Sequence, residues 1–265
     1  MAGKVYIVGA GPGAADLLTL RAVSVLRAAD IVLHDDLVSD EVLLLCASTA
    51  QVINVGKRCG DRTRTQQEIN ALMVTLAADR RIIVRLKSGD PAIFGRMGEE
   101  LDALREAGAP FEIVPGITAA AAAAASAGIT LTDRRAASAL VLMTAHNAVN
   151  GFPGRLNPRR STFAVYMPGP DYASTARELV EMGLDPDTPC SVVSNAGRPE
   201  QRVCLTSLSD LPFVIGISSP ALLIVGEVAR SGKVPERSEE PLLDCQNRRD
   251  CQILMIAGGT QHISL

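Results

Sequence analysis

Short apolar segments alternate with amphipathic segments along the first half of the chain. The apolar runs are rich in Val, Ile and Leu, as buried strands are, and they cover residues 5–9, 31–34, 51–55, 81–86 and 111–114. Segments with helical periodicity fall between them, at residues 16–28, 39–47, 65–78 and 98–107. In the third of these, Ile69, Leu72, Met73 and Leu76 share one helical face. The alternation predicts a mainly parallel α/β sheet that is covered by helices on both faces.

The second half of the chain has a different pattern, in which strands follow one another with few helices between them. The predicted strands are residues 138–144, 162–167, 190–195, 201–206 and 221–228. One clear helix, at about 171–182, interrupts them, and residues 145–160 have the composition of a loop. This pattern predicts a second α/β lobe with a mixed sheet and more antiparallel pairing.

The Pro115-Gly116 pair, followed by an alanine-rich helix, marks the boundary between the two lobes. The predicted organisation is therefore an N-terminal lobe of residues 1–115, a C-terminal lobe of residues 116–230 and a loosely ordered tail of residues 231–265. A ligand is expected in the cleft between the lobes, outside the carboxyl ends of the strands.

Charge and composition exclude several classes of function. The 265 residues carry a formal net charge of −3, so we expect no nucleic-acid partner. The six cysteines form no CxxC pair and there are only three histidines, so we predict no metal site and a reducing, cytoplasmic environment. Gly9 and Pro12 interrupt the first apolar run, and Pro115, Gly116 and Gly128 interrupt the uncharged segment 113–132. We therefore expect neither a signal peptide nor a membrane span.

The first bend, Gly9–Ala14, reads GAGPGA and follows a predicted strand. It fits the G-x-G-x-x-A pattern of dinucleotide-binding proteins, and Asp35 follows about twenty residues on, where a ribose-binding acid would lie. Pro12 argues against this interpretation, because proline removes a backbone N–H where a pyrophosphate would be bound. Taken alone, the bend is compatible with an NAD-dependent oxidoreductase, with another nucleotide-like ligand or with a turn that binds nothing.

A second bend follows another predicted strand, in the segment RLKSGDPAIFGR at residues 85–96. Its tip is Gly89-Asp90-Pro91. An aspartate between Gly and Pro can accept hydrogen bonds from a bound cofactor, and it can equally stabilise a turn. This motif alone does not distinguish the two.

The motifs taken together resemble the tetrapyrrole methylase family. They are VGAGPG, VGKR at 55–58, RLKSGDPAIFGR, GEE at 98–100, FEIVPGIT at 111–118 and YM at 166–167, and they occur in the family's order over about residues 4–228. The closest resemblance is to the branch that acts on uroporphyrinogen III. It implies a two-lobed fold and C-methylation of uroporphyrinogen III at C2 and C7 by S-adenosylmethionine. The product would be precorrin-2, for sirohaem, cobalamin or haem d1 synthesis.

The resemblance also implies roles for individual residues. S-adenosylmethionine would be bound between the lobes by Pro12, Ser88, Gly89, Asp90, Ile93, Thr118, Ala119, Met167 and Ala196. Asp35 would be the proton acceptor and Lys57 the proton donor. Arg58 and Arg96 would bind carboxylates of the substrate, since guanidinium groups bind carboxylates in a bidentate manner. Family members are typically homodimers, with no nucleic-acid or membrane partner.

Three positions depart from the family pattern, and they leave the substrate open. Ser88 and Met97 replace glycines, and Ala145 replaces a glycine after the first strand of the second lobe. If position 88 requires a positive φ, its Cβ costs about 1 kcal/mol. The alternatives are another methylase of the cobalamin pathway, an RNA-ribose or diphthamide methylase, an NAD-dependent oxidoreductase and a non-catalytic binding module. With no further catalytic domain before residue 1, we expect a monofunctional enzyme.

Overall fold

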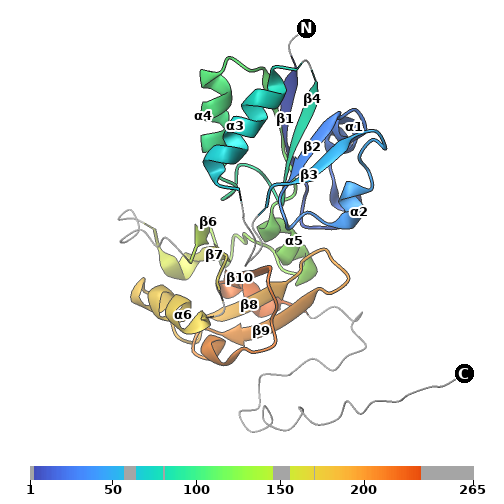
Figure 1. Cartoon of the computed structure of the whole chain (residues 1–265). Coiled ribbons are helices and arrows are strands. Elements are labelled where there is room, and N and C mark those ends of the chain that lie inside the picture. The colour runs from blue at the N-terminus through green and yellow to red at the C-terminus, as the bar shows by residue number, and fades with distance from the viewer. Residues whose placement is uncertain (1–2, 57–63, 80, 146–155, 170, 234–265) are drawn as a thin grey trace, which may run out of the picture.

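The computed structural model contains two five-stranded sheets, one in each half of the chain (Figure 1). It describes residues 3–56, 64–79, 81–145, 156–169 and 171–233. Most of the predicted tail, residues 234–265, lies outside the described residues. The first sheet and its helices form the upper lobe in Figure 1, and the second sheet forms the lower lobe.

The first sheet is entirely parallel, as the sequence predicts. Its strands are β1 (Lys4–Gly9), β2 (Ile31–His34), β3 (Gln51–Asn54), β4 (Ile82–Lys87) and β5 (Phe111–Val114). Their order across the sheet is β3-β2-β4-β1-β5. The fourth strand along the chain is therefore inserted between the first and the second.

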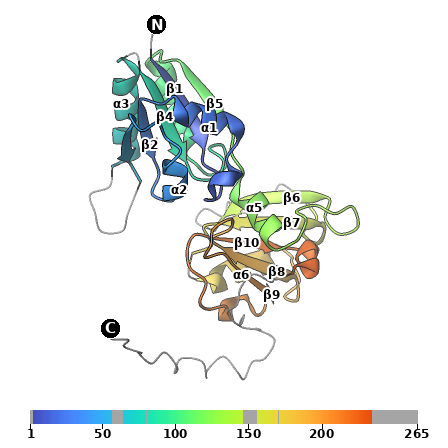
Figure 2. The same ribbon diagram turned by 90° about the vertical axis from the view of Figure 1, so that its right-hand side faces the viewer.

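Helices cover both faces of this sheet (Figures 1 and 2). They are α1 (Leu20–Arg27), α2 (Asp40–Leu43), α3 (Gln66–Ala77) and α4 (Met97–Glu106). α1 and α2 lie on one face, and α3 and α4 on the other. The helix predicted at 16–28 is interrupted, because the Thr19 side chain accepts a hydrogen bond from Ala22 N and starts α1 anew. A short 3₁₀ turn, Ala15–Leu17, precedes it.

The second sheet is mixed, again as predicted. Its strands are β6 (Ala139–Thr144), β7 (Ser161–Tyr166), β8 (Pro189–Ser194), β9 (Arg202–Ser207) and β10 (Ala221–Val225). The order is β6-β7-β10-β8-β9; β6 and β7 are parallel and the other neighbours are antiparallel. The strand predicted at 221–228 ends earlier, because Gly226, with φ 140°, turns the chain into a 3₁₀ segment, Glu227–Ser231.

Two helices cover the faces of the second sheet. α5 (Ala119–Ser126) packs on one face, in a cluster with Ala164, Val193 and Ile224, and α6 (Tyr172–Glu181) packs on the other. Among the described residues no helix is long and apolar enough to cross a membrane. The alanine-rich helix predicted after Pro115-Gly116 is present as α5, whose Ala120 and Ala123 have no exposed surface.

The strand order determines which loops meet at the second lobe. Because β4 pairs with β1 on one side and with β2 on the other, Gly9 lies opposite Lys87, and His34 lies opposite Leu86. The segments that follow these three strands consequently start side by side at the carboxyl edge of the sheet. This is the edge at which ligands bind in open parallel sheets.

Candidate active site

The two glycine-containing bends are hydrogen-bonded to each other. Gly11 N donates to Gly89 O at 3.1 Å, and Gly89 N donates to Gly11 O at 2.7 Å. Both glycines have positive φ, 66° and 67°, a conformation that is costly for other residues. The bends therefore form one rigid unit, in which the missing N–H of Pro12 is not needed for the pairing.

Two glycines, Gly9 and Gly116, allow these bends to approach the connection to the second lobe. A Cβ atom on Gly116 would lie 2.3 Å from Gly89 O and 2.8 Å from Gly9 Cα. A Cβ atom on Gly9 would lie 2.6 Å from Gly116 Cα. These are main-chain contacts, which cannot move aside as the end of a flexible side chain can.

We expect the substitution Gly116→Ala to destabilise the fold by about 1–3 kcal/mol, the range for overpacking at a filled site. Gly98→Ala, in the first turn of α4, is the matched control, because a Cβ there meets nothing within 4 Å. The control protein should be as stable as the unaltered one or slightly more so. Urea unfolding of the three proteins measures the difference, and equal midpoints for Gly116→Ala and Gly98→Ala would contradict the close packing.

A cavity of about 880 Å³ lies between the lobes, within the usual size range of ligand pockets. It is lined by every described residue to which the sequence analysis assigned a role: Pro12, Asp35, Ser88, Gly89, Asp90, Ile93, Arg96, Thr118, Ala119, Met167 and Ala196. Lys57 and Arg58 lie outside the described residues. The fold thus brings together residues from both bends, the start of α5 and two turns of the second lobe.

Asp90 is bound by the protein's own main chain. Its Oδ1 accepts a hydrogen bond from Ala92 N at 2.8 Å, and its Oδ2 accepts one from Gly116 N at 3.0 Å. Asp90 therefore ties the second bend to the connection between the lobes, as well as lining the cavity. Ser88 has no positive φ, since that conformation falls on Gly89. The strain considered for serine at this position is therefore absent.

Unusual backbone conformations are concentrated at the cavity. Among the described residues, the non-glycine residues with positive φ are Phe94, Arg96, Met167 and Asn195, with φ between 49° and 53°. The first three line the cavity, and Asn195 directly precedes Ala196, which also lines it. Such conformations are costly and persist where the surroundings enforce them, which is common at functional sites.

Tyr166, at the end of β7, connects the second lobe to the start of α5. Its hydroxyl oxygen accepts a hydrogen bond from Ala120 N at 3.2 Å and is hydrogen-bonded to Thr118 Oγ1 at 2.5 Å. The ring lies 5.0 Å from that of Phe94, between centroids. One of the first amides of α5 is therefore occupied by a side chain of the protein, which also fixes the hydroxyl of Thr118 on the cavity wall.

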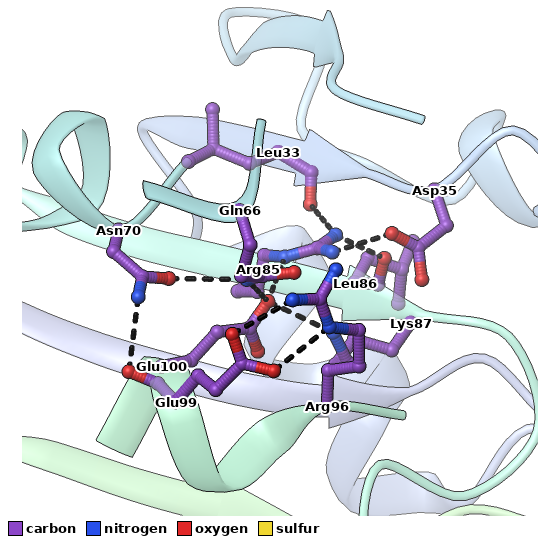
Figure 3. Close-up of polar contacts among 10 residues, drawn as sticks. All are labelled: Leu33, Asp35, Gln66, Asn70, Arg85, Leu86, Lys87, Arg96, Glu99 and Glu100. Atoms are coloured by element: carbon purple, nitrogen blue, oxygen red, sulfur yellow. Dashed lines mark hydrogen bonds and ion pairs between the residues drawn. The ribbon is translucent and has the colours of Figure 1, made fainter. Parts of the chain in front are cut away.

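A network of buried charges, whose contacts are drawn in Figure 3, includes the cavity-lining residues Gln66, Arg85 and Lys87. Glu100 Oε1 accepts hydrogen bonds from Arg85 Nε at 2.9 Å, from Lys87 Nζ at 2.8 Å and from Gln66 Nε2 at 3.2 Å. Glu100 has no exposed surface, and Arg85 is 2% exposed. Charged residues are rarely buried to this degree unless they are paired.

The network forms because of the twofold periodicity of β4. Arg85 and Lys87 share the face of the sheet that α3 and α4 cover, where Glu100 of α4 and Gln66 of α3 meet them. Burial and the neighbouring Arg85 guanidinium lower the pKa of the Lys87 ammonium group. Burial acts in the same direction on Arg85, but Asp35 and Glu100 together raise the pKa of its guanidinium.

Asp35 is held at the cavity wall by this network. Its Oδ1 accepts a hydrogen bond from Arg85 Nη2 at 2.5 Å, while its side chain remains 28% exposed. Arg85 is itself fixed by main-chain carbonyls, because Nη1 donates to Leu33 O at 3.4 Å and to Leu86 O at 3.2 Å. The result is a carboxylate of fixed orientation that is open to the cavity, as a general base requires.

Arg96 lies at the start of α4 and faces the cavity from an exposed position. It forms a two-pronged ion pair with Glu99, with Nε–Oε1 and Nη2–Oε2 distances of 2.8 Å each. The neighbouring Met97 packs into the core against α3 and is not part of the cavity wall. The methionine that departs from the family pattern therefore adds no bulk to the site.

Sequence reasoning missed Arg85, Lys87, Glu100 and Arg198 as residues of the site. A signal for the first two is present in the strand IIVRLK, where two cations occur at alternate positions of an apolar run. Such a pattern indicates a buried charge partner on the same face. Arg198 carries no comparable signal, because it lies in a turn of the second lobe and reaches the first lobe only in the folded protein.

The sequence of the chain is similar to that of known proteins. Residues 4–212 match the family model described as Tetrapyrrole (Corrin/Porphyrin) Methylases. The "Siroheme synthase 1" of Cronobacter sakazakii is 45% identical over 232 residues, which are 86% of this chain and 49% of that protein. The chain thus spans about half the length of the curated relatives it matches.

Solved structures show the same fold over most of the chain. A uroporphyrin-III-C-methyltransferase from Thermus thermophilus is 39% identical, with a TM-score of 0.74, and the match covers 87% of this chain and 95% of that one. A further structure of a Thermus thermophilus enzyme of this name, complexed with S-adenyl homocysteine, has a TM-score of 0.72 at 36% identity, over 86% of this chain and 94% of that one. The chain therefore belongs to the tetrapyrrole methylase family.

Proposed function

We propose that this chain is a uroporphyrinogen-III C-methyltransferase, which transfers methyl groups from S-adenosylmethionine to C2 and C7 of uroporphyrinogen III and so forms precorrin-2. The observation that supports this most directly is the cavity between the lobes. It unites both glycine-containing bends, the start of α5 and Asp35 in one site. The Thermus thermophilus relative of this name, 95% of whose length is matched, supports the choice of substrate.

The cavity fits S-adenosylmethionine in its size and in the character of its wall. The paired bends present main chain and glycines, so a ligand can approach the backbone closely. Apolar surface is added by Pro12, Ile93, Ala119, Met167 and Ala196. These residues, with Gly89 and Thr118, would hold the cofactor, which supplies an electrophilic methyl group on its sulfonium centre.

The residues of this chain would contribute alignment, proton transfer and substrate binding. Holding two reactants in line is worth about 7–11 kcal/mol of the barrier. In the proposed mechanism, methylation leaves a cationic tetrapyrrole, and Asp35 would accept the proton that this tetrapyrrole loses. Lys57 would be the proton donor. Arg96, which lines the cavity, and Arg58 would bind carboxylates of the substrate.

The proposal is limited to methyl transfer, because the relatives named siroheme synthase are about twice as long as the matched segment. The chain corresponds instead to nearly the whole length of the Thermus thermophilus enzyme. We further propose that the protein acts as a cytoplasmic homodimer in a tetrapyrrole pathway, with uroporphyrinogen III as its small-molecule partner.

We expect incubation with freshly prepared uroporphyrinogen III and S-adenosylmethionine to give a product heavier by two methyl groups. Mass spectrometry of the product, with S-adenosylhomocysteine quantified in parallel, tests this. The control reaction omits S-adenosylmethionine, and a parallel reaction offers a later precorrin of the cobalamin pathway in place of uroporphyrinogen III.

The same preparation also separates the alternative functions. Retention of labelled NAD in place of labelled S-adenosylmethionine would indicate an oxidoreductase and contradict the proposal. Methylation of the later precorrin alone would move the proposal to another reaction of the same family. Binding of S-adenosylmethionine without methylation of either tetrapyrrole would indicate a non-catalytic binding module and contradict the proposal.

A further inference from the structure

Arg198 crosses from the second lobe to the first at the cavity wall. It follows β8, and its half-buried side chain lines the cavity. Its Nε donates a hydrogen bond to Pro12 O at 3.3 Å, and its Nη2 donates to Leu37 O. One guanidinium group therefore contacts both the first bend and the loop after β2, which carries Asp35.

Gly13 provides the surface on which Arg198 lies. A Cβ atom on Gly13 would be 2.4 Å from Arg198 Nε and 2.8 Å from its Cγ. On the other side of the contact, a Cβ atom on Gly197 would be 3.0 Å from Pro12 Cγ. Two glycines, one in each lobe, thus permit the bend and the turn to meet closely enough for Arg198 to reach its acceptors.

The turn that carries Arg198 is firmly anchored within the second lobe. Arg198 N donates to Asn195 O at 2.9 Å, and Gln201 N donates to Arg198 O at 3.1 Å. Gln201 Oε1 accepts hydrogen bonds from Gly197 N at 2.8 Å and from Ser126 Oγ, at the end of α5, at 2.6 Å. A movement of the first bend would therefore be resisted by α5, whose first residue also lines the cavity.

We propose that Arg198 is a positioning residue for methyl transfer, which fixes the first bend and the Asp35 loop relative to the second lobe. Its acceptors lie at Pro12, on the wall assigned to the cofactor, and at Leu37, two residues after Asp35. Arg198 thus sets the separation between the cofactor and the proton acceptor without contacting either reacting atom. This role rests on the proposed function, since it concerns the geometry of that reaction.

Arg198→Met tests the proposal, because methionine keeps part of the packing on Gly13 and removes both donors. We expect the single-turnover rate of methyl transfer to fall about 10- to 100-fold, as for a misplacement of about 1 Å. The Kd for S-adenosylhomocysteine should change much less than the rate. Arg177→Met, an exposed arginine on α6, is the matched control and should leave both quantities unchanged.

Arg198→Lys separates positioning from a simple effect of charge. A lysine ammonium is a point charge that does not reproduce the planar guanidinium fork, so we expect this variant to remain slow. Recovery of the full rate by lysine would overturn the positioning role. So would a rate of Arg198→Met within twofold of the unaltered protein.

Hydrogen exchange gives a readout that does not depend on activity. In Arg198→Met we expect faster amide exchange in residues 10–18 and 35–39, and in Arg177→Met we expect no change there. If the unaltered protein fails to methylate uroporphyrinogen III, the proposed function is wrong, and faster exchange would still show that Arg198 holds these loops. Unchanged exchange in both segments would overturn the inference.

Discussion

Replacement of Asp35 by asparagine is expected to lower the rate of methyl transfer by about 100-fold or more, as is typical when a general base is removed. Asparagine has the same shape and keeps an oxygen that can accept the hydrogen bond from Arg85 Nη2. It cannot accept a proton from the methylated substrate. The loss should therefore appear in kcat, while the Kd for S-adenosylhomocysteine stays close to that of the unaltered protein.

Asp36→Asn is the matched control for this change. Asp36 is the next residue and accepts a hydrogen bond from Asn54 Nδ2 at 3.2 Å, but it does not line the cavity. Single-turnover methylation and calorimetric titration with S-adenosylhomocysteine should be measured on both variants. Equal activity of Asp35→Asn and the unaltered protein would refute the assignment, and a loss confined to cofactor affinity would assign Asp35 to binding.

The second large effect is expected on stability. Within the described residues, Glu100→Gln removes the carboxylate that pairs with both Arg85 and Lys87. It leaves Arg85 with Asp35 as its ion-pair partner and removes the ion pair of the buried Lys87. Removal of one member of a buried ionic network costs about 3–5 kcal/mol, because the other charges stay buried without compensation. We therefore expect a large decrease in the free energy of unfolding, measured with urea at pH 7.

The preceding residue provides a precise comparison. Glu99 undergoes the same change of chemistry in Glu99→Gln, but its ion pair with Arg96 is exposed, at 50% and 52% of the two side chains. Exposed pairs contribute at most about 1 kcal/mol. A Glu99→Gln variant as unstable as Glu100→Gln would contradict the assignment of the effect to burial.

The effect of Glu100→Gln should also depend on pH. The pKa of Lys87 is lowered in the folded protein from its ordinary value of 10.5, so between the two values the unfolded chain binds more protons. Stability therefore rises with pH in that window. Without Glu100 the pKa of Lys87 in the folded protein falls further, and the pH range in which stability rises becomes wider. The loss of unfolding free energy caused by Glu100→Gln should therefore be smaller at pH 9 than at pH 7. A penalty that does not change with pH would exclude Lys87 as the affected cation.

Hydrophobic periodicity predicted the elements of the fold well, because it reports burial directly. The parallel strands of the first lobe and the mixed sheet of the second are both present. At two element ends a local hydrogen bond or a glycine overrides the pattern. Thr19 starts α1 late by capping Ala22 N, and Gly226 ends β10 before the apolar run is finished.

The sequence by itself determined the chemistry that can line the cavity. The glycines of both bends are recognisable from their local motifs, and the resemblance to the tetrapyrrole methylases pointed to the apolar residues of the predicted cofactor site and to Asp35. Every described residue to which a binding or catalytic role was assigned lines the cavity.

Only the tertiary structure decided which of these groups act on one another. The position of β4 between β1 and β2 joins the two bends, buries Arg85 beside Asp35 and directs Lys87 to Glu100. The contact of Arg198 with Pro12 and Leu37 likewise joins segments that are more than a hundred residues apart. The physical reason is that periodicity records whether a strand is buried, whereas the neighbours of a strand depend on how crossover connections pack across the whole sheet.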